Sequence, residues 1–264
     1  MQRHYPNLLQ SIALFLQLIL VMAIILLPYV IFRYITNNAG ILSRFDSFYF
    51  YGSKITAQLL IIFYAFRKIR KTDSFSLKKE LNVNFRSHWL FAILGAIALI
   101  FLMEPLEQFV PATSILQLHF ANLTNQKFGS LLFIVILSPI MNETIFRGVI
   151  LRGLLKNYKP VVSILLGSLI FALFHVSLLQ AVIAFALSLF IGFIYWQTRS
   201  LALCILLHIL NNGIAYTIII LAGEIKSTAS LIDNTLLYLT FYLAAAMIFS
   251  TSLLQVYKKN ELNL

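Results

Sequence analysis

The chain has 264 residues, of which 60% are hydrophobic and only 11% are charged. A soluble domain carries about a quarter charged residues, so this composition argues against a soluble protein. The net charge of +11 would suggest nucleic acid as a partner of a soluble chain. Here the basic residues lie in short segments between apolar runs, which favours membrane topology over nucleic-acid binding.

The apolar runs predict an all-α polytopic membrane protein, because helices satisfy every backbone hydrogen bond within lipid. The alternating pattern of a membrane barrel is absent, and no separate soluble domain is recognisable, so residues 1–264 are read as one transmembrane domain. We predict eight spans around a polar cavity: Leu8–Phe32, Phe48–Phe66, Trp89–Val110, Gly129–Leu155, Val161–His175, Leu178–Trp196, Leu201–Leu221 and Thr235–Tyr257. The only cysteine, Cys204, lies in an apolar run and is expected to be a packing residue.

The distribution of basic residues predicts that both termini are cytoplasmic. Eight spans leave Arg33, Arg44, Lys54, Lys127 and Lys226 on the opposite side and Arg147 within a span. The remaining fourteen of the 20 Lys and Arg residues lie with the termini. The loop Arg67–Arg86 is the one long basic segment. We interpret it chiefly as a topology determinant and expect anionic lipid near it.

The predicted fourth span contains ionisable residues, which are costly within a bilayer and therefore suggest a function. Glu143 and Arg147 are four residues apart, so they share one face of a helix and can pair. Asn142 points about 100° away from Glu143, and Pro139 favours a kink beside a site. A buried Glu–Arg pair that only holds two helices together is the alternative interpretation.

Two further spans carry isolated polar residues. His175 closes the predicted fifth span, and His208 and Asn212 are four residues apart in the seventh. Taken singly, each is more often an interfacial residue or an interhelical hydrogen-bond partner. Together they predict one polar cavity, because no lipid-facing arrangement tolerates such a set. A histidine beside a carboxylate can activate water, and a second histidine with an asparagine can stabilise an oxyanion, as amide hydrolysis requires.

Three motifs in this order resemble the CPBP (CAAX protease and bacteriocin-processing, or Abi) intramembrane proteases. The first is Asn142-Glu143-Thr-Ile-Phe-Arg147, preceded by Pro139 and followed by Gly148; Phe171-x-x-x-His175 and His208-x-x-x-Asn212 are the second and third. The resemblance covers residues 128–215, which we take as the core of the domain. It implies cleavage of a membrane-embedded or membrane-associated peptide or protein in the cell membrane, with a bacterial membrane expected.

The resemblance also implies roles for individual residues. The first Glu of the motif and the second-motif histidine would activate water, the third-motif His208 and Asn212 would form the oxyanion hole, and Arg147 would support the site. We therefore expect Glu143, His175, His208 and Asn212 to be catalytic, with Asn142 and Arg147 supporting. The implied mechanism needs no cofactor, although the sequence leaves a divalent metal such as zinc open.

This chain departs from the family pattern at one position. The water-activating Glu is replaced by Asn142, and a neutral amide is not a useful general base. Either Glu143 would have to leave Arg147 to take over, or His175 would act alone while Asn142 positions the water. The alternative function is a catalytically inactive relative, for example a scaffold or a bacteriocin-immunity protein.

Overall fold

The computed structural model describes residues 4–36, 39–72, 76–81, 87–106, 131–175, 177–222, 232 and 234–261, and its regular elements there are all helices. They are α1 (Leu8–Thr36), α2 (Ala39–Thr72), α3 (Leu77–Glu80), α4 (Ser87–Met103), η1 (Leu131–Leu137), α8 (Ser138–Ile145), η2 (Phe146–Leu151), α9 (Arg152–Asn157), α10 (Pro160–Ala172), α11 (Leu178–Thr198), α12 (Leu201–Ala222) and α14 (Thr235–Glu261). The chain is thus an all-α protein, as its sequence predicts.

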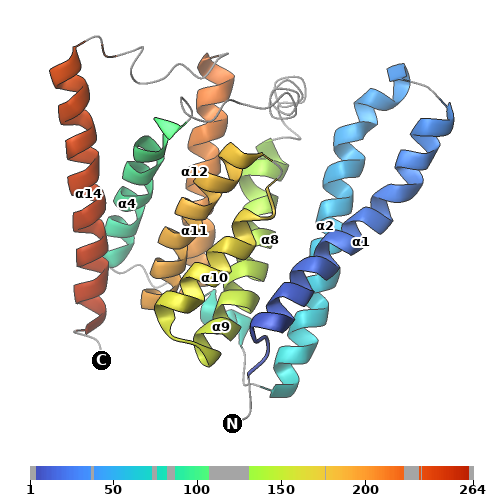
Figure 1. Ribbon diagram of the computed structural model, residues 1–264, viewed down its shortest axis with the longest axis horizontal. Helices are drawn as coiled ribbons and strands as arrows, with labels where there is room; N and C mark the ends of the chain where they lie inside the picture. Colours follow the sequence, from blue (N-terminus) through green and yellow to red (C-terminus); the bar gives the residue numbers. More distant parts are fainter. Residues whose placement is uncertain are drawn as a thin grey trace.

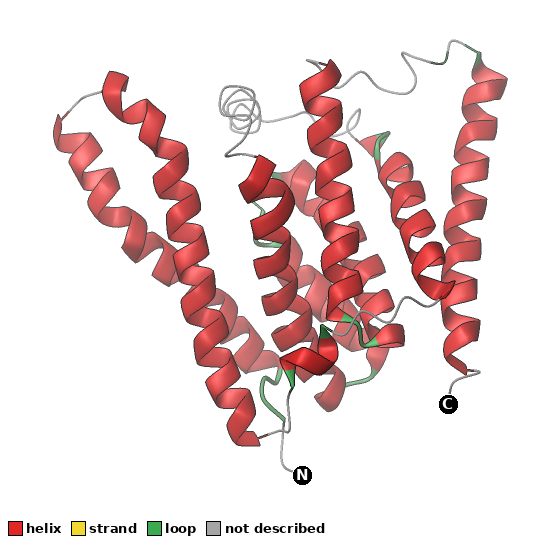
Figure 2. Ribbon diagram, turned by 180° about the vertical axis from the view of Figure 1, so that it is seen from behind, coloured by secondary structure: helices red, strands yellow, loops and turns green. Residues whose placement is uncertain are grey.

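The helices form three groups side by side (Figures 1 and 2). The α1–α2 hairpin flanks a central cluster of α8 to α12 on one side, and the α4–α14 pair flanks it on the other. Contacts of α2 with α8, and of α4 with α12, join the groups. The first turn of α1 and the last turn of α14 lie at the same end of the molecule (Figure 1), as an even number of crossings requires.

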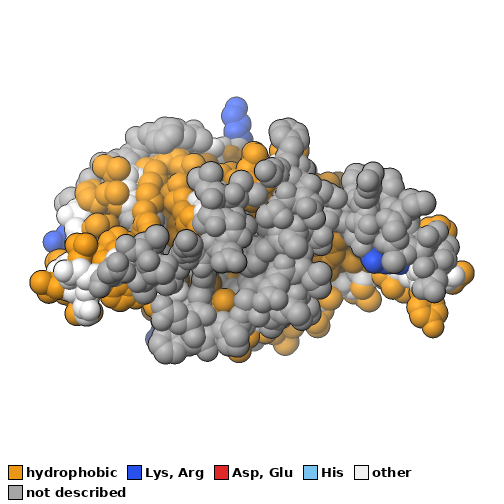
Figure 3. Space-filling model, turned by 90° about the horizontal axis from the view of Figure 1, so that it is seen from above, with side chains coloured by type: hydrophobic (Ala, Val, Ile, Leu, Met, Phe, Trp, Pro, Cys, Tyr) orange, Lys and Arg blue, Asp and Glu red, His pale blue; other side chains and the backbone are white. Residues whose placement is uncertain are grey.

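Five helical segments are long and apolar enough to cross a membrane. They are Leu8–Ile35, Leu131–Asn157, Leu178–Thr198, Leu201–Ile218 and Thr235–Lys258, and two shorter apolar helices, Trp89–Met103 and Pro160–Ala172, lie among them. In Leu131–Asn157, 67% of the most apolar stretch is buried, whereas only 11% of the corresponding stretch is buried in α1 and in α14. The outer helices therefore present apolar side chains outward, and Figure 3 shows hydrophobic side chains over much of the described surface. This is the surface of a polytopic membrane protein.

Residues Leu131–Asn157 form one continuous helix, in which two π-helical segments, η1 and η2, flank α8. In a π register each carbonyl bonds the N–H five residues later. The carbonyl of Ile134 would then face residue 139, which is a proline and has no N–H. The π segment accordingly ends just before Pro139, and α8 begins with this proline in its first turn.

The structure corrects two predicted boundaries. The second span was expected to begin at Phe48, but the helix that contains it, α2, already begins at Ala39. The fifth span was expected to reach His175, but α10 ends at Ala172. The N–H groups of Phe174 and His175 bond carbonyls three residues back, at 3.1 and 3.0 Å, so the last turn tightens and His175 lies beyond the helix.

Other predictions fall partly outside the described residues. These include the end of the third span at Val110, the start of the fourth at Gly129, and residues 73–75 and 82–86 of the basic loop. Cys204 is fully buried, as expected for a packing residue, and its Sγ lies 3.9 Å from the Ile191 carbonyl oxygen.

Candidate active site

A buried ion pair stands at the centre of the molecule. Nη1 of Arg147 donates to Oε1 of Glu143 at 2.9 Å, and both residues are almost fully buried. The pair joins α8 to η2 one turn later, as the four-residue spacing predicts. Nη2 of Arg147 also donates to Oγ and to the carbonyl oxygen of Ser188 on α11, at 3.0 and 3.2 Å. These contacts fix the guanidinium in low-dielectric surroundings.

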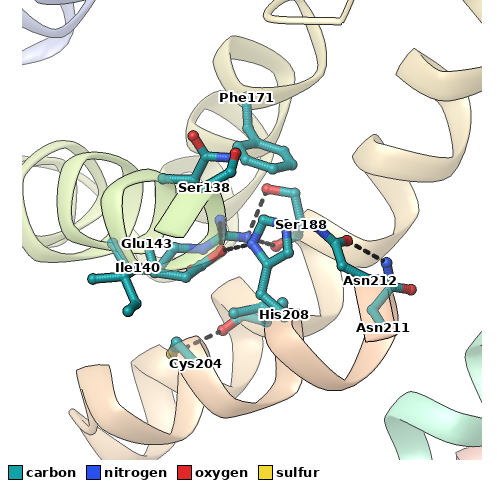
Figure 4. Close-up of polar contacts among 12 residues, drawn as sticks. Ser138, Ile140, Glu143, Phe171, Ser188, Cys204, His208, Asn211 and Asn212 are labelled. Atoms are coloured by element: carbon teal, nitrogen blue, oxygen red, sulfur yellow. Dashed lines mark hydrogen bonds and ion pairs between the residues drawn. The ribbon is translucent and has the colours of Figure 1, made fainter. Parts of the chain in front are cut away.

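The same carboxylate oxygen binds the histidine of the third motif. Nδ1 of His208 on α12 lies 2.6 Å from Oε1 of Glu143, and Figure 4 shows Glu143, Ser188 and His208 converging from three helices. A carboxylate fixes an imidazole with its proton on the facing nitrogen, which directs Nε2 away from the pair. The second carboxylate oxygen, Oε2, is buried and has no hydrogen-bond partner among the described residues.

Asn142 faces a different helix from its neighbour Glu143. Its Oδ1 accepts a 2.7 Å hydrogen bond from Nε2 of Gln58 on α2, and its Nδ2 donates to Oγ of Ser138 at 3.4 Å. Nζ of Lys54, one turn before Gln58, donates to the same Ser138 oxygen at 3.3 Å. The two successive motif residues thus lie in different polar networks, one with α2 and one with α12.

The ring of Phe171 brings the second motif to the ion pair. Its centroid lies 4.9 Å from Cζ of Arg147, 5.3 Å from the ring of His175 and 5.8 Å from the ring of His208. Nδ1 of His175 is 3.3 Å from the Phe171 carbonyl oxygen. The two motif histidines therefore lie on the periphery of one aromatic ring, beside the guanidinium.

The asparagine of the third motif contacts the π-helical segment. Nδ2 of Asn212 donates to the Ile134 carbonyl oxygen at 2.9 Å, and its Oδ1 accepts from Nδ2 of Asn211 at 3.1 Å. This carbonyl is the one that Pro139 leaves without a backbone donor in the π register. An amide nitrogen carries two protons, so a second N–H of Asn212 remains beyond this bond.

The structure thus places five of the six sequence-predicted site residues on neighbouring helices and His175 just beyond the end of α10. Glu143, Arg147 and His208 are in direct contact, His175 lies across Phe171, and Asn142 and Asn212 take part in flanking hydrogen bonds.

Sequence reasoning missed three polar residues of the site: Ser188, Gln58 and Lys54. Ser188 gives no signal, because a lone serine in an apolar span usually satisfies itself on its own helix. Gln58 and Lys54 did give a signal, since an amide and an ammonium in a predicted membrane span need a partner.

The arrangement is suited to proton transfer and to hydrogen bonding of a developing oxyanion. It supplies a carboxylate-bound imidazole, a second imidazole and a primary amide close together. Among the residues described, no three His, Cys, Asp or Glu side chains gather as a set of metal ligands.

Comparison with known proteins finds a family match for the segment that carries the candidate site. Residues 124–214 match the family model described as "Type II CAAX prenyl endopeptidase Rce1-like", which covers about a third of the chain and includes all three motifs. No curated protein and no solved structure matches the chain. The family match confirms the resemblance to the CAAX proteases over the segment that carries the candidate site.

Proposed function

We propose that the protein is an intramembrane endopeptidase that hydrolyses a peptide bond of a membrane-associated protein or peptide. The observation that carries the proposal is the 2.6 Å contact between Glu143 and His208, two motif residues from separate helices, with Arg147 on the same carboxylate. A carboxylate bound to an imidazole in a buried polar site is a recurring device for activating water or a nucleophile. The family match over residues 124–214 supports the same reaction class.

In this mechanism Glu143 holds His208 and stabilises the imidazolium that forms when Nε2 takes a proton from water. The activated water attacks the scissile carbonyl, and the proton passes to the leaving amine. His175 lies across Phe171 and is the second group able to carry a proton at the site. The second N–H of Asn212 is the candidate donor to the oxyanion. Arg147 holds the Glu143 carboxylate in place and does not need to touch substrate.

A set of quenched fluorogenic peptides, incubated with the purified protein in detergent, tests the proposal. We expect the wild type to cleave at least one peptide. His208→Ala and His175→Ala should each lower the rate by about 10²- to 10⁴-fold, the usual contribution of a general acid or base. His4→Ala is the matched control, because His4 is exposed and lies outside the site. Equal turnover by all four proteins, or turnover by none, would contradict the proposal.

A second function is favoured by Asn142. The amide that replaces the expected Glu is bound to Gln58 at 2.7 Å, and Glu143 is already engaged with Arg147 and His208. A protein of this fold without hydrolytic activity could bind a membrane partner, in immunity to a bacteriocin or as a scaffold. Under this alternative the wild type cleaves nothing, Asn142→Glu gains proteolysis, and the wild-type gene still complements its own deletion.

A further inference from the structure

Lys54 is a cation on α2 that faces the candidate site. Its Nζ donates to Oγ of Ser138 at 3.3 Å and lies 5.0 Å from the ring centroid of Phe174, just beyond α10. Ser138 is buried and Lys54 is half-buried, so the ammonium lies against the first turn of α8. The side chain therefore points from α2 toward the residues of the site.

No carboxylate of the described residues lies within ion-pair distance of this ammonium. Glu143 is the acidic residue of the central helix, and its ion-pair contacts are with Arg147 and His208. A cation that is partly removed from water is costly unless an anion or water compensates it. The hydroxyl of Ser138 and the face of Phe174 stabilise the charge only in part, since neither carries a negative charge.

We infer that Lys54 and Ser138 form a subsite for a carboxylate of the molecule that enters the site. The carboxylate would belong to a peptide, either at its C-terminus or on an Asp or Glu side chain, so the inference rests on the proposed peptide substrate. An ammonium and a hydroxyl together offer a carboxylate one charge-assisted and one neutral hydrogen bond. Asn142 lies one turn from Ser138 and donates to the same hydroxyl as Lys54, so the subsite adjoins the first motif.

The asparagine at position 142 leaves the positive charge of Lys54 available in the subsite. Nδ2 of Asn142 and Nζ of Lys54 both donate to the same Ser138 oxygen. A glutamate at 142, the residue that the family resemblance leads one to expect, would reach the same place and neutralise Lys54. With asparagine there, the ammonium is left for a ligand. The subsite and a glutamate at 142 are therefore mutually exclusive.

Fluorescence anisotropy in detergent, with labelled apolar peptides in matched pairs, tests the inference. One pair differs in a C-terminal acid or amide, and the other in an internal Asp or Asn, so the two sources of the carboxylate are distinguished. We expect the wild type to bind one acidic peptide about ten- to a hundredfold more tightly than its neutral twin, the usual range for a hydrogen bond to a charged group. Lys54→Met and Asn142→Glu should abolish this preference, Lys54→Arg should keep it, and Lys54→Glu should reverse it.

Lys71→Met is the matched control, because Lys71 lies on the same helix and is exposed. Size-exclusion chromatography checks that each variant is folded, and Lys54→Arg provides a second folded variant. The inference would be overturned if the wild type bound the acidic and the neutral peptide of each pair equally, or bound neither. A preference for the acidic peptide that survives in Lys54→Met would also overturn it. A Lys54-dependent preference without any cleavage would leave the subsite standing and count against the peptidase alone. Equal cleavage of the acidic and the neutral peptide would support the peptidase and count against the subsite.

Discussion

At the scale of single residues, the buried triad of Glu143, Arg147 and His208 lies at the centre of the candidate site. One carboxylate oxygen accepts from a guanidinium at 2.9 Å and from an imidazole at 2.6 Å, and all three side chains are buried. A buried pair of opposite charges adds little stability compared with apolar packing, but removing one partner leaves the other charge buried without compensation. The triad is therefore expected to be strongly coupled in its energetics.

We predict that Glu143→Gln and Arg147→Met each lower the free energy of unfolding by about 3–5 kcal/mol, because each removes one partner of a buried ion pair. The double variant should cost clearly less than the sum of the two, by more than about 1 kcal/mol, since it removes both charges. Unfolding of the protein by a denaturing detergent in mixed micelles, followed by circular dichroism, measures these differences. Lys159→Met, at an exposed position, is the control and should change stability by less than about 0.5 kcal/mol. Additive costs would show that the charges are not coupled.

At the scale of the element, one proline explains the shape of the central helix. Pro139 has no N–H, so the π register of η1 cannot continue past it, and the Ile134 carbonyl needs another donor. The side chain of Asn212 supplies that donor from α12 at 2.9 Å. This bond ties the third motif to the turn that precedes the first motif, and so it positions the candidate catalytic residues relative to one another.

We predict that Asn212→Ala destabilises the protein by about 1–3 kcal/mol, because the partly buried Ile134 carbonyl loses its side-chain donor. In a Pro139→Ala background the cost should shrink to less than about 1 kcal/mol, because residue 139 then has an N–H within the same helix. The comparison uses the four proteins of this cycle and the unfolding measurement described above. An unchanged cost in the Pro139→Ala background would show that the Ile134 carbonyl is not what Asn212 stabilises.

At the scale of the whole molecule, the sequence predicts the helices better than their contacts. Long apolar runs locate α1, α11, α12 and α14 closely, because length and hydropathy alone decide them. The i, i+4 spacing also predicts the Glu143–Arg147 pair. The contact between Glu143 and His208 joins two helices, so no local sequence pattern predicts that Nδ1 of His208 lies beside Oε1 of Glu143. The network of Asn142 with Gln58 likewise depends on how α2 packs against α8.

Another contact that no local sequence pattern predicts links α3, in the basic loop Arg67–Arg86, to the central helices. In the short helix α3, Oε1 of Glu80 accepts from Nε of Arg152 at 3.0 Å, and Oε2 accepts from the hydroxyl of Tyr195 on α11 at 2.7 Å. This one acidic side chain holds the segment after α2 against η2–α9 and α11. Burial raises the pKa of the Glu80 carboxyl, against the opposing effects of the Tyr195 hydrogen bond and the nearby Arg152.

This raised pKa predicts a pH dependence of stability with a definite sign. Between the ordinary pKa of 4.5 and the raised value, the folded protein binds more protons at Glu80 than the unfolded chain does. Stability from this group is therefore fully present below pH 4.5 and falls as the pH rises through the folded pKa. Relative to Glu80→Gln, which cannot titrate, the wild type should lose stability over this window. Unfolding of both proteins in detergent from acidic to neutral pH measures the difference, and a difference that stays constant or grows with pH would contradict the assignment.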